Sequence, residues 1–180
     1  MKKQKIVIRL FCLLAFTTAT FAQDAEIRKN SGYFDLSAVG KMFNEEPTLE
    51  INLEGFLLTM AASATKVAEP DLAEVMDNLI YVRVERYDLP FDKRRDIQDK
   101  NSELAKSLDG KGWERIVRVR ENNDDVYVYV KTDKQKISGI VVMAIEGSKS
   151  VIFANIVGSI DPDQIGRLGS RWDVDHLDSI

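Results

Sequence analysis

The clearest arrangement of chemically useful side chains is a set of tyrosines and arginines at alternate positions of three segments with strand periodicity. Tyr and Arg are enriched at binding hot spots, so an exposed sheet face made of them would suit a partner. The alternative is cross-strand pairing, in which Arg stacks on Tyr and stabilises the sheet. The candidate binding residues are Tyr81, Arg83, Arg118, Arg120, Tyr127 and Tyr129.

A second cluster lies at the carboxyl end of the chain, where carboxylates gather around the single histidine, His176. Imidazole and carboxylate ligands can hold a divalent cation. The alternative is a polar tail, because chain ends are rarely rigid enough to preorganise a site. We therefore predict no metal site and no cofactor, and leave open whether Asp173, Asp175, His176 and Asp178 bind a metal.

Motifs for catalysis occur only without their companions. The S-x-x-K pattern at 63–66 lacks the S-D-N and K-T-G segments that accompany a nucleophilic serine, and the Gly147–Ser150 segment joins two expected strands. Asp124 and Asp125 are adjacent in an expected turn, so their carboxylates should diverge into water. The sequence predicts a protein that is not an enzyme. Two alternatives stay open: a hydrolase of envelope polymers that uses carboxylates unpaired in sequence, and a small-molecule carrier.

The first residues have the three parts of a secretory signal peptide. Three lysines fall within residues 1–5, an apolar stretch covers 10–16, and small and polar residues lead to Ala22. The apolar stretch is too short for a membrane span, which needs about 20 residues. The sequence predicts cleavage between Ala22 and Gln23, export to the periplasm or cell envelope, and no stable membrane insertion afterwards.

Composition narrows the possible partners. The net charge is −4, and removal of the four cations in residues 1–22 would bring it to −8. Such a surface repels phosphate backbones, so nucleic acid is not an expected partner. The one cysteine, Cys12, lies in the signal segment, which leaves the exported chain without disulfides or thiolate ligands. The sequence leaves the oligomeric state open.

Hydrophobic periodicity predicts an α+β fold with a largely antiparallel sheet of about five strands and helices packed on it. Residues 23–34 are polar and read as a flexible lead-in, and 35–180 read as a single domain. In the strand around residues 80–87, we expect Ile80, Val82 and Val84 to face the core, with the tyrosines on the opposite face. The expected helices cover 36–43, 56–64, 70–79 and 92–108, and the expected strands cover 49–53, 80–87, 113–121, 126–131, 137–146 and 151–158.

Two segments carry a resemblance to a known family. The YVRV strand at 81–84 and the segment at 151–161, with its N-I-V-G-x-I-D run, resemble an exported bacterial family called domain of unknown function 4252. The resemblance would cover most of the exported chain. It implies a periplasmic or cell-envelope location in a Gram-negative host and brings no catalytic residues. Within that run, Asn155 is expected to bond neighbouring backbone, Gly158 to end a strand, and Asp161 to cap a helix.

Together these observations predict an exported, non-enzymatic cell-envelope domain that binds a protein or envelope component through an exposed Tyr/Arg sheet face.

Overall fold

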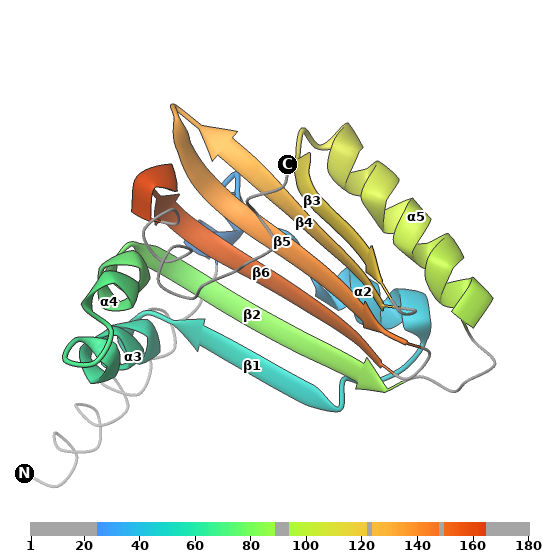
Figure 1. Cartoon of the computed structure of the whole chain (residues 1–180), viewed down its shortest axis with the longest axis horizontal. Coiled ribbons are helices and arrows are strands. Elements are labelled where there is room, and N and C mark those ends of the chain that lie inside the picture. Colours follow the sequence, from blue (N-terminus) through green and yellow to red (C-terminus); the bar gives the residue numbers. More distant parts are fainter. Residues whose placement is uncertain (1–24, 89–93, 122–123, 148–149, 165–180) are drawn as a thin grey trace, which may run out of the picture. The chain divides into compact units, whose positions relative to one another are not determined.

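The computed structural model describes residues 25–88, 94–121, 124–147 and 150–164. Residues 1–30 form a separate unit, in which 25–29 are helical. Residues 31–180 form the second unit, built on an antiparallel six-stranded sheet in the order β1-β2-β6-β5-β4-β3 (Figure 1). The α+β class is confirmed, and the sheet has one strand more than the five or so that we expected.

The elements follow the order expected from the sequence. The strands are β1 (Leu49–Glu54), β2 (Leu79–Asp88), β3 (Glu114–Glu121), β4 (Asp124–Asp133), β5 (Lys136–Glu146) and β6 (Ser150–Ile160). The helices are α2 (Ser37–Phe43), α3 (Phe56–Thr65), α4 (Pro70–Asp77) and α5 (Arg94–Gly110). Lys134 and Gln135 take positive φ between β4 and β5, and Gly147 does so before β6, as tight reversals of the chain require.

One face of the sheet carries the main core. Tyr87 and Phe153 meet edge to face, with ring centroids 6.2 Å apart, and Tyr129 and Met143 are fully buried beside them. Leu36 and Val39 at α2, and Leu104 and Leu108 on α5, join the same cluster. Figure 1 shows α2 behind the sheet, on the side that these residues share.

This arrangement corrects the face assignment made from the sequence. Tyr81, Tyr87, Tyr127 and Tyr129 are between 0% and 7% exposed, so the tyrosine-bearing face is the helix-covered core face. The opposite face is aliphatic, and Val82 and Val84 are half-buried there. Our expectation of an exposed tyrosine face is therefore wrong.

A buried asparagine holds the start of the second unit against the sheet. The Asn155 side chain accepts a hydrogen bond from the Phe34 N–H at 2.9 Å and donates to the Gly32 carbonyl at 3.0 Å. Gly32 and Gly139 pack backbone against backbone, since a Cβ on Gly139 would lie 2.4 Å from the Gly32 Cα. Residues 31–34, which we placed in a flexible lead-in, are thus packed against β5 and β6.

The remaining motif positions are structural as well. Asn155 bonds backbone groups as predicted. Gly158 does not end its strand, because β6 continues to Ile160. A Cβ at Gly158 would lie 2.5 Å from the Asn78 carbonyl oxygen, so close approach of backbone requires glycine there. The Asp161 carboxylate accepts a hydrogen bond from the Asp163 N–H at 3.0 Å, which confirms the predicted cap.

Candidate functional site

The six predicted binding residues separate into two groups on the core face. Tyr81 and Arg83 lie on β2, whereas the other four lie on β3 and β4. Strands β6 and β5 stand between β2 and β4, so the six residues do not form one surface.

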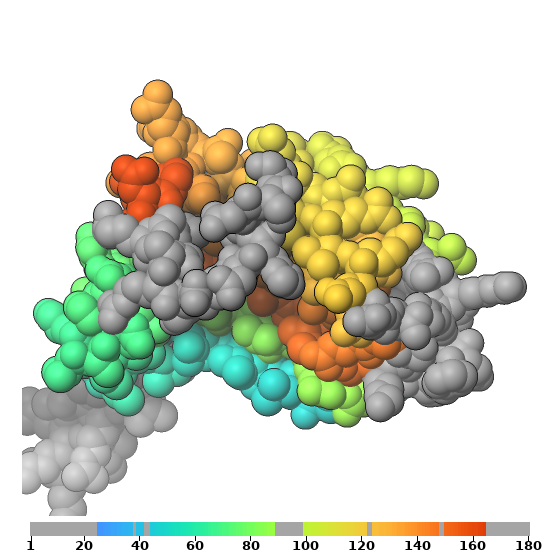
Figure 2. Space-filling view, in the orientation of Figure 1, coloured from blue at the N-terminus to red at the C-terminus, as the bar shows by residue number. Residues whose placement is uncertain are grey.

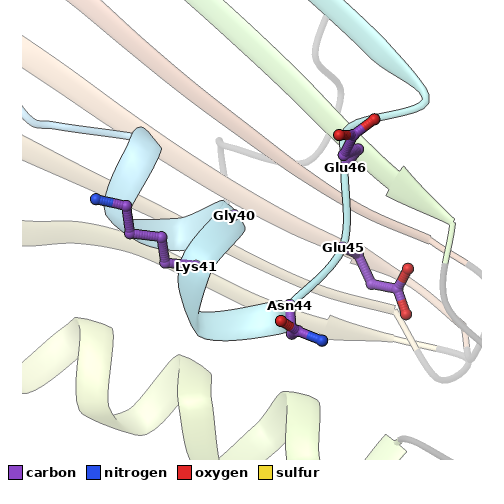
Figure 3. A pocket seen from close by; sticks show the side chains of 5 residues that line it. All are labelled: Gly40, Lys41, Asn44, Glu45 and Glu46. Atoms are coloured by element: carbon purple, nitrogen blue, oxygen red, sulfur yellow. The ribbon is translucent and has the colours of Figure 1, made fainter.

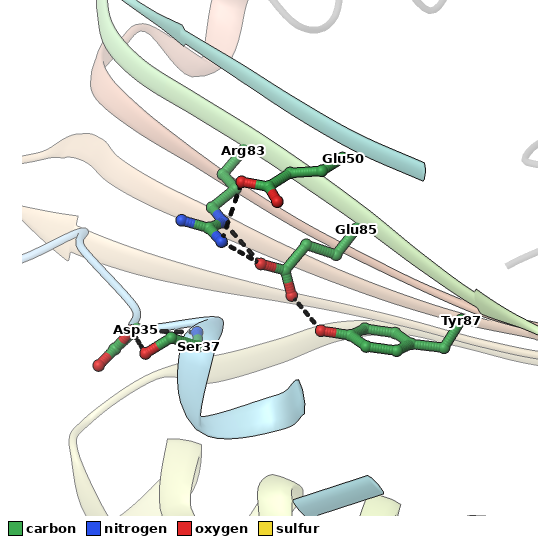
Figure 4. A network of polar contacts seen from close by, with 6 residues as sticks. All are labelled: Asp35, Ser37, Glu50, Arg83, Glu85 and Tyr87. Carbon is green, nitrogen blue, oxygen red and sulfur yellow. Dashed lines mark hydrogen bonds and ion pairs between the residues drawn. The ribbon is translucent and has the colours of Figure 1, made fainter. Parts of the chain in front are cut away.

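The β2 group belongs to a closed polar network (Figure 4). The guanidinium of Arg83 donates to Glu85 Oε1 at 2.6 Å, and the Tyr87 hydroxyl donates to Glu85 Oε2 at 2.6 Å. Arg83 Nη2 also lies 3.2 Å from Glu50 Oε1 on the neighbouring strand β1. Burial and the hydrogen bond to Glu85 raise the pKa of Tyr87 well above its ordinary value. This network supplies the hydrogen bonds and the opposite charge that the buried Glu85 carboxylate needs.

The same network is the place to examine the hydrolase alternative, because Arg83 bridges two carboxylates there. Glu85 is 1% exposed, and both of its oxygens already accept hydrogen bonds. A general acid or base needs a face open to its substrate. The pair of Glu50 and Glu85 therefore gives that alternative no support.

The β3–β4 group faces α5 across an open cleft. Two adjoining hollows of about 340 and 210 Å³ share Asn101, Ser102, Arg118 and Tyr127 in their walls. We call their combined lining the arginine cleft. It consists of Asp99, Asn101, Ser102, Ala105, Arg115, Arg118, Arg120, Asp125 and Tyr127.

Strand register explains why the arginines gather. Arg118 pairs with Tyr127 and Arg120 with Asp125 across the β3–β4 ladder, so all four side chains share one face. Arg115 pairs with Tyr129 on the same face, and a bulge after it restores the alternation. Because β3 is an edge strand, Arg115, Arg118 and Arg120 are exposed while the tyrosines behind them are buried.

The three arginines are held differently. Arg120 Nε donates to Asp125 Oδ1 at 2.7 Å, and hydrogen bonds with Asp125 and Tyr127 raise the pKa of Arg120. The Arg118 guanidinium lies 5.6 Å from the centroid of the Tyr127 ring, and it has no ion pair with a described residue. Arg115 is near the Tyr129 hydroxyl; burial raises the pKa of Tyr129 and Arg115 lowers it in part.

The sequence revealed only part of this cleft. Asp125, which we expected to point into water, is 5% exposed and neutralises Arg120. Asn101 and Ser102 on α5 were missed, because polar residues on a charged helix give no signal until the helix is placed. Arg115 was missed because the bulge takes it out of simple alternation with Arg118 and Arg120.

A further hollow of about 620 Å³ lies at the end of α2 and is lined by Gly40, Lys41, Asn44, Glu45 and Glu46. Figure 3 shows that the Lys41 side chain points away from the two glutamates. The charged groups around this hollow therefore do not converge on one ligand position. None of the predicted binding residues lines the hollow.

Within the described ranges, no group of three or more His, Cys, Asp or Glu side chains is placed to hold a metal ion. The His176 cluster lies outside those ranges. None of the described helices has the length and apolar character that crossing a membrane would need.

Comparison with known proteins gives one match. A search of curated proteins and a search of solved structures found no significant similarity. The family model of a domain of unknown function, DUF4252, matches residues 40–168, which include every described residue of the arginine cleft. This span is well over half of the chain, so the protein belongs to the DUF4252 family.

Proposed function

We propose that this protein is an exported binding protein and that its arginine cleft binds a carboxylate-rich segment of a partner protein in the cell envelope. The observation that carries the proposal is the convergence of three guanidinium groups on one open cleft, with Tyr127 and Ser102 hydroxyls and the Asn101 amide beside them.

The chemistry of the cleft favours anions. Guanidinium forks form paired hydrogen bonds to carboxylates, and Arg118 lies over the Tyr127 ring without an ion pair to any described residue. Arg120 is already neutralised by Asp125, which leaves Arg115 and Arg118 as the cations facing a ligand. The described lining has three arginines against Asp99 and Asp125, a net charge of +1 (3 − 2) on a chain of net charge −4, which favours an acidic segment at this place.

The shape favours an extended peptide segment. Two hollows that share walls form an open trough beside the exposed edge strand β3, whose residues are exposed at seven of eight positions. An extended segment can lie along such an edge and present side chains at alternate positions. The sequence supports export through its lysine-rich start, short apolar stretch and Ala22–Gln23 junction.

Arg118→Ala should weaken binding of a fluorescein-labelled hexaglutamate peptide by about tenfold or more, because it removes the guanidinium that both hollows share and that pairs with no described acid. The affinity of Arg118→Lys for the peptide should lie between those of wild type and Arg118→Ala, since lysine keeps the charge but loses the forked pair of donors. Fluorescence anisotropy measures both, with inorganic phosphate as a competing probe for a general anion site.

The matched control is Arg86→Ala, which removes a half-buried arginine paired with Asp88 on β2, outside the cleft. This variant should bind hexaglutamate as wild type does. A control probe in which glutamine replaces each glutamate should not bind the wild-type protein. Equal affinity for wild type and Arg118→Ala would refute the assignment of the cleft.

Export has its own expected result. Protein recovered from the envelope fraction of its native host should begin at Gln23 when its amino terminus is sequenced, because the Ala22 junction fits signal cleavage. A chain that starts at Met1 and stays in the cytosolic fraction would contradict the proposal.

A further inference from the structure

Helix α3 is an uncharged helix with an exposed apolar side. Its ten residues contain no Asp, Glu, Lys or Arg. Phe56, Leu57 and Met60 are 74%, 47% and 52% exposed, and Val67, just beyond the helix, is 96% exposed. A helix that is apolar all round is normally buried. Exposed apolar groups that cluster in this way mark an interaction surface.

The fold uses the other side of α3. Leu58 and Ala62 are its buried residues, although the apolar residues that recur at helical spacing in the sequence are Phe56, Leu57, Met60, Ala61 and Ala64. Packing within the domain therefore leaves the larger apolar side chains available. We call Phe56, Leu57, Met60, Ala64 and Val67 the α3 surface.

The hydroxyls of α3 add little polarity to that surface, because they bond to their own helix. Ser63 Oγ donates to the Thr59 carbonyl at 2.8 Å, and Thr65 Oγ1 donates to the Ala62 carbonyl at 3.0 Å. Thr59 Oγ1 likewise donates to the Gly55 carbonyl at 3.3 Å. Each hydroxyl presents less of its hydrogen-bonding capacity to the outside.

Acidic residues lie on α4 and just before it, and α4 is the helix that follows α3 and packs beside it. Both helices lie at the surface of the molecule in the green part of Figure 2. Between residues 56 and 77 there are four acids and one base, Lys66. The acids are Glu69, Asp71, Glu74 and Asp77.

From these features we infer that the α3 surface docks a cationic amphipathic helix of a partner protein. An apolar face with basic residues along one border complements both the exposed side chains of α3 and the acidic residues of the neighbouring helix α4. The surface from Phe56 to Ala64 covers about 12 Å of helix, which matches roughly two turns of a partner helix. The same acids repel anionic lipid headgroups, so they disfavour a membrane surface as the occupant.

This surface is separate from the arginine cleft, because α3 contacts β1 and the cleft adjoins β3, the two opposite edges of the sheet. Its test is therefore independent of the proposed function. The probe is a fluorescein-labelled 18-residue helical peptide of leucine and lysine with one apolar face, and the control probe replaces each lysine with glutamate.

The leucine–lysine peptide should bind the purified protein at least tenfold more tightly than the leucine–glutamate peptide. The Phe56→Ser/Met60→Ser variant should lose tenfold or more of that affinity, since both side chains are exposed and their removal spares the core. The matched control is Ile116→Ser/Val119→Ser, which removes two apolar residues that are 55% and 47% exposed on β3, and it should bind as wild type does.

Three results would overturn the inference. One is equal affinity of the leucine–lysine peptide for wild type and the Phe56→Ser/Met60→Ser variant. The second is sedimentation with phosphatidylglycerol vesicles that depends on Phe56 and Met60, which would make the occupant a membrane. The third is a dimer that the same variant abolishes, which would make the occupant a second copy. Circular dichroism of each variant verifies that it is folded.

Discussion

Tyr129→Ala should lower the free energy of unfolding by about 3–5 kcal/mol, the range typical of a large aromatic side chain removed from a core. Tyr129 is 0% exposed and lies in the cluster that joins α5 to β4, β5 and β6. Truncation would leave a cavity in this cluster, which also contains Leu104, Leu108 and Met143, and a close-packed core fills such a cavity only in part. Urea denaturation followed by circular dichroism measures the change.

The control for this prediction is Ile116→Ala, which shortens an apolar side chain that is 55% exposed on β3. It should change the unfolding free energy by less than about 1 kcal/mol, because surface substitutions rarely cost more. If Tyr129→Ala were as mild as Ile116→Ala, the tyrosine face would not be the core face.

Asn155→Ala should also be severely destabilising and should lower the free energy of unfolding by about 3 kcal/mol or more. Its side chain bonds the Phe34 N–H, the Gly32 carbonyl and the Ile140 carbonyl, at 2.9, 3.0 and 3.2 Å. Removing it takes a hydrogen-bond partner from each of these backbone groups, and such a loss at a buried group costs roughly 1–3 kcal/mol. The backbone contact between Gly32 and Gly139 prevents the segment from moving to new partners.

Asn52→Ala, on the exposed edge strand β1, is the matched substitution and should be nearly silent. Thermal unfolding of the two variants side by side gives the comparison. A small loss in Asn155→Ala, similar to that in Asn52→Ala, would mean that residues 31–34 are not held by this side chain.

The order and type of the elements could be predicted because local patterns determine them. Alternation in β2 and β4 and continuous apolar runs in β5 and β6 mark strands whichever face is covered, and Pro70 begins α4 at a helical first turn. The choice of core face could not be predicted in this way. Both faces of the central strands are apolar, and Tyr87 and Tyr129 bury their rings as readily as Val82 or Val84 would.

The arginine cleft shows the same limit. Arg118, Arg120 and Tyr127 were predicted to share a face, and the β3–β4 register places them together. Their separation from Tyr81 and Arg83 depends on β6 and β5 inserting between β2 and β4, a long-range pairing that no local pattern encodes. The orientation of α3 could not be predicted for a related reason, since an uncharged helix has no polar face to reveal which side packs on the sheet.

We infer that the tyrosines build the core and that the exposed arginines bind an acidic partner. Both parts are tested when hexaglutamate affinity and unfolding free energy are measured on one preparation of Arg118→Ala. We expect a loss of affinity of about tenfold with an unfolding free energy within about 0.5 kcal/mol of wild type, because Arg118 is exposed. Unchanged affinity, or a loss that appears only as the variant unfolds, would contradict this inference.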